Sequence, residues 1–347
     1  MAINLDKVDV GDDHPPYVIA EISCNNNGRL DTALDLIRAA KQAGANAVKF
    51  QAYTADTITM NSRHESFYIK EGLWKGYYLY DLYKKSETPF EWFPHLFDFA
   101  REQGITPFAS VFDRSSVDML ERLDCPFYKI ASFEFTDVPL VEYVASTGKP
   151  IILSTGMASH DEIKNTVNAL PPWHSIALLH CISSYPAQME DTNLWMIQYL
   201  KSNFLVPVGF SDHAPWIMAA PVAIASGACI IEKHIMLQDG ERPLDYEFSL
   251  GPSSFALMTG WIHAAWKSLQ AGKRPESETA SRSFRRSIYA VRDISSGEVL
   301  SSDNIRSIRP GAGLPASLLP LVLGKVCVRD VSCGCPLLSD DVEMDAK

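Results

Sequence analysis

The stretch VGFSDHAPW at 208–216 places a hydroxyl, a carboxylate and an imidazole directly after an apolar run, where turn residues are usual. A second apolar run, CIIEKH, ends in His234. If both runs are neighbouring strands, His213 and His234 converge, and two imidazoles suit a divalent transition metal with open positions for water and a substrate oxygen. A single histidine would more often be a core side chain. Asp212 either orients a metal ligand or pairs with a lysine.

Ionisable and hydroxyl side chains recur at the ends of the other apolar runs. Burying them costs free energy unless they are paired or functional, so their recurrence at one end of most runs indicates a site. They include Glu21, Lys49, Gln51, Ser110, Lys129, Ser132, Glu134, Ser154, His180, Ser183, Tyr185, Ser211 and Glu232. Lysines beside hydroxyls suit phosphate and carboxylate groups, and Glu21 and Glu134 are candidates for a general base or a substrate anchor. The alternative for each of these side chains is a structural role, in a layer of polar side chains that fills the interior of a β-barrel.

The elements that must hold these side chains are short and apolar. Eight near-continuous apolar runs, typical of strands covered on both faces, occur at 17–21, 47–51, 106–110, 127–132, 150–155, 176–181, 206–211 and 229–234. Helical patterns lie between most of them, as in 30–44, where apolar residues share one face before Gly44. Eight strands alternating with helices over about 250 residues predict a (β/α)8 TIM barrel. A doubly wound sheet is the alternative, but no GxGxxG motif follows the first run.

Two segments depart from the regular alternation. Residues 52–88 form a long connection dense in aromatics, which predicts a lid or substrate wall, or an insertion packed on a helix or a partner subunit. Charged and small residues at 271–283 predict a linker. We therefore expect a barrel domain at 1–270 and a small β-rich domain at 284–347.

The bulk composition excludes several functions. A net charge of −11 argues against a nucleic-acid partner or an anionic membrane surface. We find no signal peptide and no apolar run near the roughly 20 residues of a membrane span. Seven scattered cysteines predict reduced thiols in a cytoplasmic protein, with Cys181 and Cys229 as small core residues.

Motifs along nearly the whole chain resemble the sialic acid synthase family. The motifs are IAEISCNNNG, AGANAVKFQAYT, YKIASFE, LSTGM, HCISSYP, GFSDH, EKH and IRPGAGLP. The resemblance implies condensation of phosphoenolpyruvate with an amino-sugar aldose to a nonulosonic acid, and its C-terminal part is similar to the family's antifreeze-like (SAF) domain. Within the family, YKIASFE and the insertion GLWKGYYLYDLYKKSETPFEW look most like pseudaminic acid synthases, whose aldose is a 2,4-diacetamido-2,4,6-trideoxy-altrose.

The resemblance also implies a role for each matching residue. It implies His213 and His234 as ligands of a divalent metal, Mn²⁺ first, with Co²⁺, Mg²⁺ or Zn²⁺ as alternatives. Glu21, Glu134, Lys49 and Lys129 match catalytic positions. The substrate-binding positions are Gln51, Ser132, Ser154, Ser183, Tyr185, Ser211, Asp245 and Arg309. Arg309 matches an arginine that the SAF domain offers to the partner's barrel, which implies a domain-swapped homodimer.

Three departures from the family pattern and three rival functions stay open. Asn26 replaces a histidine, Val111 replaces a proline, and residues 214–216 read Ala-Pro-Trp, which marks the pocket as a place for altered specificity. The rivals are an N-acetylneuraminate or legionaminate synthase using N-acetylmannosamine or its 2,4-diacetamido analogue, another metal-dependent barrel aldolase, and a non-catalytic binding subunit.

Overall fold

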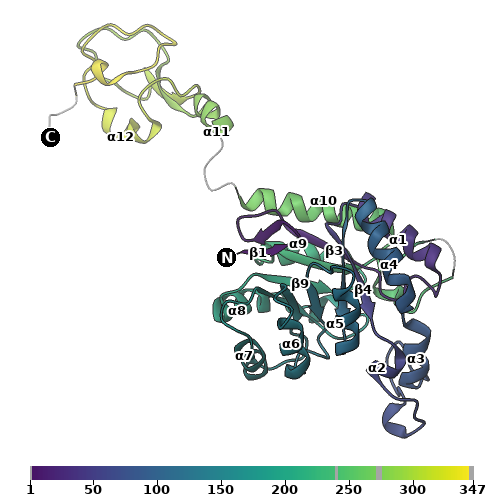
Figure 1. Cartoon of the computed structure of the whole chain (residues 1–347). Coiled ribbons are helices and arrows are strands. Elements are labelled where there is room, and N and C mark those ends of the chain that lie inside the picture. Colours follow the sequence, from purple (N-terminus) through teal and green to yellow (C-terminus); the bar gives the residue numbers. More distant parts are fainter. Residues whose placement is uncertain (1, 239–240, 271–275, 344–347) are drawn as a thin grey trace. The chain divides into compact units, whose positions relative to one another are not determined.

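The computed structural model describes residues 2–238, 241–270 and 276–343. The chain forms two compact units, Met1–Gln270 and Ala271–Lys347 (Figure 1). Of the predicted linker, 271–275 lies outside the described residues, while α11 (Glu276–Ala280) and a 3-10 turn (Ser281–Phe284) occupy most of the rest. Within the described ranges, we find no helix long and apolar enough to cross a lipid bilayer.

The first unit confirms the predicted TIM barrel. Eight parallel strands close in the order β10-β3-β4-β5-β6-β7-β8-β9. They are β3 (Tyr17–Glu21), β4 (Ala47–Ala52), β5 (Thr106–Val111), β6 (Tyr128–Ile130), β7 (Ile151–Ser154), β8 (Ile176–Cys181), β9 (Val208–Asp212) and β10 (Ile230–His234). Each coincides with one of the eight apolar runs, and nearly every strand residue is buried because helices cover the outer face and side chains fill the interior.

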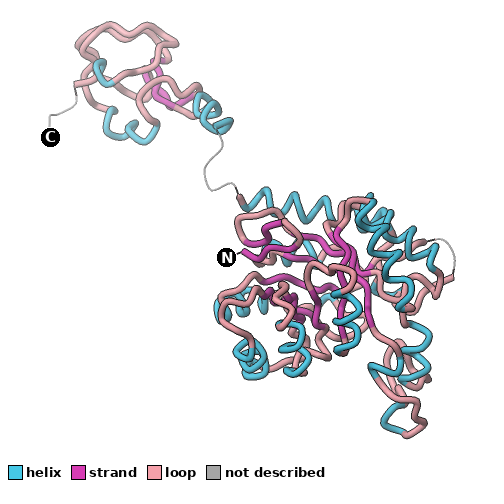
Figure 2. Tube along the Cα trace, in the orientation of Figure 1, coloured by secondary structure: helices cyan, strands magenta, loops and turns pink. Residues whose placement is uncertain are grey.

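Helices surround the strands in the expected alternation (Figures 1 and 2). They are α1 (Leu30–Gln42), α4 (Phe93–Glu102), α5 (Arg114–Glu121), α6 (Val138–Ala145), α7 (His160–Ala169), α8 (Trp195–Phe204), α9 (Ala219–Ala225) and α10 (Pro252–Leu269). Local chemistry sets their ends: the Asp113 carboxylate accepts the first free backbone N–H groups of α5, and Gly44 adopts φ +86° after α1. The buried face of α1 contains Leu36. Leu34, an apolar residue of the same helix, is only half-buried.

A hairpin that the sequence analysis does not predict supports the N-terminal end of the barrel. Strands β1 (Ala2–Leu5) and β2 (Val8–Gly11) pair antiparallel, and Ile3, Leu5 and Val10 join the barrel core. The Thr106 hydroxyl, at the start of β5, donates to the Asp6 carboxylate at 2.9 Å. The hairpin therefore packs at the end of the barrel remote from the strand ends that carry the candidate site.

The long connection after β4 is an ordered excursion. It contains α2 (Ala55–Ile58) and α3 (Leu79–Ser86), joined by loops in which Tyr68 and Tyr78 form a β-bridge and pack their rings at 5.1 Å. Figure 1 shows α2 and α3 projecting beyond the C-terminal end of β4. This position lets the segment contribute to the mouth of the barrel.

The second unit has a core of its own. Strand β11 (Ser287–Ala290) pairs antiparallel with β12 (Ile305–Ile308), and α12 (Leu319–Val322) follows. Most of the unit is loop (Figure 2). Its buried residues form a separate cluster that includes Ile288, Leu300, Ile305, Val322 and Leu337. The composition of 284–347 predicts a small β-rich domain, and this unit has that character.

Candidate active site

Side chains on β9 and β10 alternate between two environments. Glu232 pairs in register with Ser211, and Lys233 with Asp212. Because successive strand residues point to opposite faces, Ser211, Glu232 and both terminal histidines line the barrel mouth while Asp212 and Lys233 point outward. Asp212 pairs with Lys233 at 3.0 Å, which is the lysine-pairing alternative of the sequence analysis.

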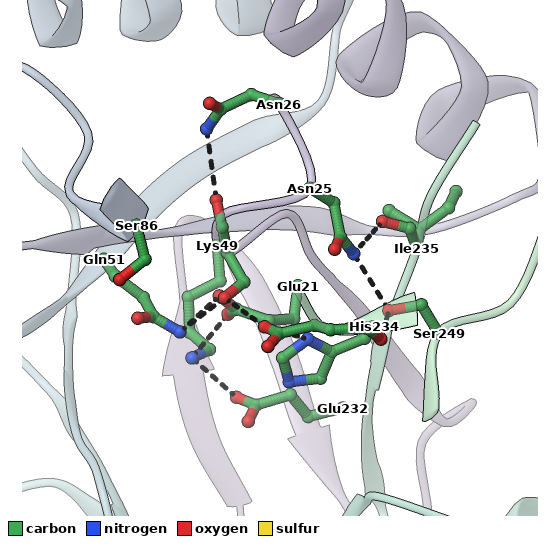
Figure 3. A network of polar contacts seen from close by, with 12 residues as sticks. Glu21, Asn25, Asn26, Lys49, Gln51, Ser86, Glu232, His234, Ile235 and Ser249 are labelled. Carbon is green, nitrogen blue, oxygen red and sulfur yellow. Dashed lines mark hydrogen bonds and ion pairs between the residues drawn. The ribbon is translucent and has the colours of Figure 1, made fainter. Parts of the chain in front are cut away.

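Lys49 is the centre of a charged group at the floor of the site. Its Nζ lies 2.5 Å from Glu21 on the neighbouring strand β3, and 3.7 Å from Glu232 on β10, beyond β3 (Figure 3). It also donates to Ser110 Oγ at 2.9 Å. All of these side chains are buried. Burial opposes the charge of Lys49, but Glu21 and Glu232 outweigh burial and raise its pKa. The lysine is therefore a fixed ammonium with two carboxylates beside it.

Lys129 has a different environment from Lys49. Its Nζ donates to Ser154 Oγ at 2.7 Å and to the Ile130 carbonyl at 3.1 Å, and within the described ranges it forms no ion pair. Burial lowers its pKa, although Glu232 opposes this shift. Nearby, the hydroxyls of Ser132 and Ser183 bond to each other at 2.8 Å. A bound anion would restore the charge that burial disfavours on Lys129, so this corner suits a phosphate or carboxylate.

A second hydrogen-bonded group lies on the opposite flank of Glu21. Gln51 Nε2 donates to Ser23 Oγ at 2.9 Å and to Glu21 Oε1 at 3.2 Å, and Ser23 Oγ donates to Asp245 at 2.6 Å. Asp245 Oδ2 in turn lies 3.5 Å from His234 Nδ1. Burial raises the pKa of Asp245 to about 6. These groups present amide, hydroxyl and carboxyl functions suited to a polyhydroxylated ligand.

The chemistry of the two histidines fits a divalent metal. Their ring centroids lie 5.6 Å apart, and Phe248 packs against both rings. His213 Nδ1 contacts the Ile182 carbonyl at 3.1 Å, which assigns the proton to Nδ1 and leaves the Nε2 lone pair free. Burial lowers the pKa of His213 to about 4 and lowers that of His234 well below its usual value, so both imidazoles are neutral, the form that can bind a metal. Among the described residues we find no cluster of three or more His, Cys, Asp or Glu side chains suited to a metal, so open positions would remain.

Glu134 is a carboxyl group whose pKa lies near neutrality. Burial raises its pKa to about 7, and its Oε2 has no hydrogen-bond partner in the described chain. The side chain lines the same cavity as the two histidines. A carboxyl group poised near neutral pH is suited to give or take a proton.

These groups share one cavity of about 420 Å³ at the C-terminal ends of the strands. It is lined by all predicted site residues of the first unit except Glu21, Ser183 and His180. Glu21 and Ser183 are hydrogen-bonded to the lining residues Gln51 and Ser132, whereas the buried His180 ring bonds to the Thr192 carbonyl at 2.8 Å outside the cavity. Arg309 belongs to the second unit, where its side chain is exposed. Opposite the polar floor, the excursion after β4 contributes what we call the apolar wall, formed by Ile58, Ile69, Trp74, Leu79, Leu82 and Tyr83.

The structure changes the significance of two departures noted in the sequence. Asn26 is buried, and its amide caps its own loop by donating to the Ser23 carbonyl and accepting from the Gly28 N–H, apart from the group around Lys49 (Figure 3). Residues 214–216 do not line the cavity either, and Trp216 is 65% exposed. The expectation that this stretch shapes the pocket therefore disagrees with its position, which is outside the cavity lining.

Three residues belong to the site although the sequence indicates no specific role for them. Glu232 and Ser110 stand at strand ends in the sequence, and both contact Lys49. Ser23, in the loop after β3, links Gln51 to Asp245. The strand pattern carries a signal for the first two, whereas the contact of Ser23 with a residue 222 positions away has no sequence signal.

Comparisons with known proteins agree with this geometry. The sequence profile of the NeuB family matches residues 36–274, and that of the SAF domain matches 285–343. A pseudaminic acid synthase of Campylobacter jejuni is 40% identical over 333 residues, 95% of this chain and 97% of that protein. An N,N'-diacetyllegionaminic acid synthase of Legionella pneumophila is 34% identical over 336 residues, 94% of each chain. The structure of N-acetylneuraminic acid synthetase from Leptospira borgpetersenii superposes with a TM-score of 0.72 and 34% identity, over 81% of this chain and 96% of that chain.

Proposed function

Because the chain belongs to the NeuB family, we propose that it condenses phosphoenolpyruvate with 2,4-diacetamido-2,4,6-trideoxy-altrose to pseudaminic acid, releasing phosphate. The chain is an enzyme of the pseudaminic and sialic acid synthase type, a transferase that forms a C–C bond. Identity of 40% to the Campylobacter synthase, against 34% to the legionaminic acid synthase, supports this choice of acceptor.

One observation carries the proposal: a single cavity brings together a buried lysine that forms no ion pair among the described residues, two neutral histidines and a carboxyl group with a pKa near 7. The condensation must bind an anion, activate a carbonyl group as an electrophile and transfer a proton. Lys129 with Ser154 is our candidate for an anionic group of phosphoenolpyruvate. The amide of Gln51 and the carboxyl of Asp245 are candidates for contacts to the sugar.

The reaction needs two bond-forming events. C3 of phosphoenolpyruvate attacks the aldehyde carbon of the open-chain sugar, and the aldehyde oxygen takes a proton and becomes a hydroxyl. Water adds at C2 and loses a proton, which leaves a hydroxyl group in a tetrahedral adduct. The C–O bond to phosphate then breaks as the C2 carbonyl forms, and the hydroxyl proton leaves with the phosphate. We propose that the Glu134 carboxylate accepts the proton of that water. Glu21 is the alternative acceptor, although its carboxylate is paired with Lys49. Lys49 and Lys129 orient the anionic groups and stabilise charge that develops during the reaction.

His213 and His234 would hold a divalent metal, with Mn²⁺ the first candidate. When bound, the metal supplies Lewis-acid polarisation of the aldehyde oxygen. The backbone carbonyl of Ile182 orients His213, and the Phe248 ring limits the rotation of both imidazoles. We further propose that the enzyme is a homodimer in which Arg309 completes the site of the partner subunit.

Phosphate release tests the proposal directly. The protein is incubated with Mn²⁺, phosphoenolpyruvate and either 2,4-diacetamido-2,4,6-trideoxy-altrose or N-acetylmannosamine, and the product mass is measured. We expect release with the first aldose and a loss of about 10²–10³-fold in kcat for Lys129→Met. Lys164→Met, on the exposed face of α7, is the matched control. Metal-loaded protein that releases no phosphate with any 2-acetamido aldose would overturn the proposal.

A further inference from the structure

The apolar wall separates the cavity into two chemically different halves. The strand ends contribute charged and polar groups, whereas the excursion after β4 contributes Ile58, Ile69, Trp74, Leu79, Leu82 and Tyr83. Residues 52–88 also contain many lysine, arginine, aspartate and glutamate side chains, and none of these lines the cavity. The segment therefore turns these six apolar side chains inward and its charges outward.

Two polar atoms beside the wall are occupied by each other, and Trp74 Nε1, which has no hydrogen-bond partner in the described chain, is itself buried. Tyr53 OH and Ser86 Oγ, which also line the cavity, bond to each other at 2.9 Å. Ser86 Oγ also donates to the Leu82 carbonyl at 2.8 Å. A ligand hydroxyl placed here would lose its water and find few free partners, whereas a methyl group would cover apolar surface.

A chain of aromatic contacts fixes which end of a ligand meets the wall. The ring centroids of Trp74 and Tyr185 lie 5.4 Å apart, and those of Tyr185 and His213 lie 4.6 Å apart. The wall thus lies one aromatic ring beyond the histidines that face the aldehyde in the proposed function. Ile58, Ile69 and Leu79 are only half-buried, so they keep apolar surface that a substrate can cover.

We infer that the apolar wall selects acceptor sugars whose end remote from the aldehyde carries methyl groups, as in a 6-deoxy sugar with an acetamido substituent, over sugars with hydroxyl groups there. This inference rests on the proposed function. Ile69 and Leu79 are specificity-determining residues that contact the remote end of the acceptor. An apolar pocket discriminates by about 10- to 100-fold for one such difference.

A pair of acceptors that differ at one position tests this selection. The two sugars are 2,4-diacetamido-2,4,6-trideoxy-altrose and the same aldose with a hydroxyl at C6. We expect kcat/KM of the parent enzyme to favour the 6-deoxy sugar by about 10- to 100-fold. Ile69→Asn and Leu79→Asn should bring the ratio within about 3-fold, mainly through KM for the sugar, with KM for phosphoenolpyruvate unchanged. Met60→Asn is the matched control, because Met60 lies in the same segment, is 60% exposed and does not line the cavity.

The outcomes separate the inference from the proposed function. Phosphate release with equal kcat/KM for the two sugars in the parent, or an unchanged ratio in both variants, overturns the inference and leaves the function standing. Absence of release with every aldose overturns the function and the inference with it. The parent ratio requires no substitution, so the inference can fail even if a variant does not fold.

Discussion

Asp212 and Lys233 form an ion pair at 3.0 Å in which neither side chain is exposed to solvent. Lys233 also donates to the carbonyls of Ala214 and Trp216, and Asp212 accepts from the Ala214 N–H. Each member of the pair immediately precedes a histidine of the site. The pair therefore holds the ends of β9 and β10 from outside the barrel, while the next residue in each strand faces the cavity.

Removing the lysine should leave a buried carboxylate without its partner. We expect Lys233→Met to lower the free energy of unfolding by about 3–5 kcal/mol, measured by urea denaturation, because the desolvation cost of Asp212 is no longer offset. Arg63→Met, at the exposed pair with Asp81, is the control and should change stability little. Equal losses in both variants would show that the buried pair has no special structural role.

Glu134 should make stability depend on pH in a defined window. Burial raises its pKa from 4.5 to about 7, so between these values the folded protein holds a proton that the unfolded chain has released. The free energy of unfolding should therefore fall as pH rises through this window, and Glu134→Gln should flatten that fall. Glu142→Gln, exposed on α6, is the control. If Glu134 also acts as the base, kcat/KM of the parent should rise with a midpoint near pH 7, and this limb should vanish in Glu134→Gln.

The two histidines should determine metal content. We expect His213→Ala or His234→Ala to weaken Mn²⁺ binding by more than the roughly 10- to 100-fold typical of losing an outer partner. The double variant should contain no stoichiometric metal by elemental analysis. A chelator should abolish phosphate release by the parent, and added Mn²⁺ should restore it. His263→Ala on α10 is the control. Full metal content in the double variant would contradict the assignment.

Arg309 offers a test of the proposed dimer through complementation. Arg309→Ala and Lys129→Met should each be nearly inactive as homodimers. A mixture of the two variants should regain about one quarter of parent activity after random exchange, because half the dimers are mixed and one of their two sites is intact. Two copies of the same variant, mixed with each other, provide the control. Activity that stays at the level of the single variants would mean that Arg309 does not serve the partner's site.

The strands of the barrel could be predicted because burial on both faces leaves a simple signature. The run at 17–21 is apolar until it stops at Glu21, and the barrel fold then requires the ends of such runs to meet. The β1–β2 hairpin lacks such a run, since each strand has only four residues and two of the four are exposed. Its place becomes evident only through contacts with the barrel.

The detailed site could be predicted less well than the strands. The residue types at the strand ends indicate an anion and metal site, but the distribution of charge depends on tertiary contacts. Lys49 and Lys129 look alike in sequence, yet two carboxylates neutralise the first and none pairs with the second in the described chain. Asn26 shows the converse, because its position in a motif suggests a substrate contact while its side chain completes a turn. A cytoplasmic location stays a prediction.

The apolar wall comes from one uninterrupted stretch of chain between β4 and α4. A single recombination event on each side of this stretch would exchange the wall whole and leave all eight strands intact. Lineages that share the barrel can then exchange this side of the cavity without passing through inactive ancestors.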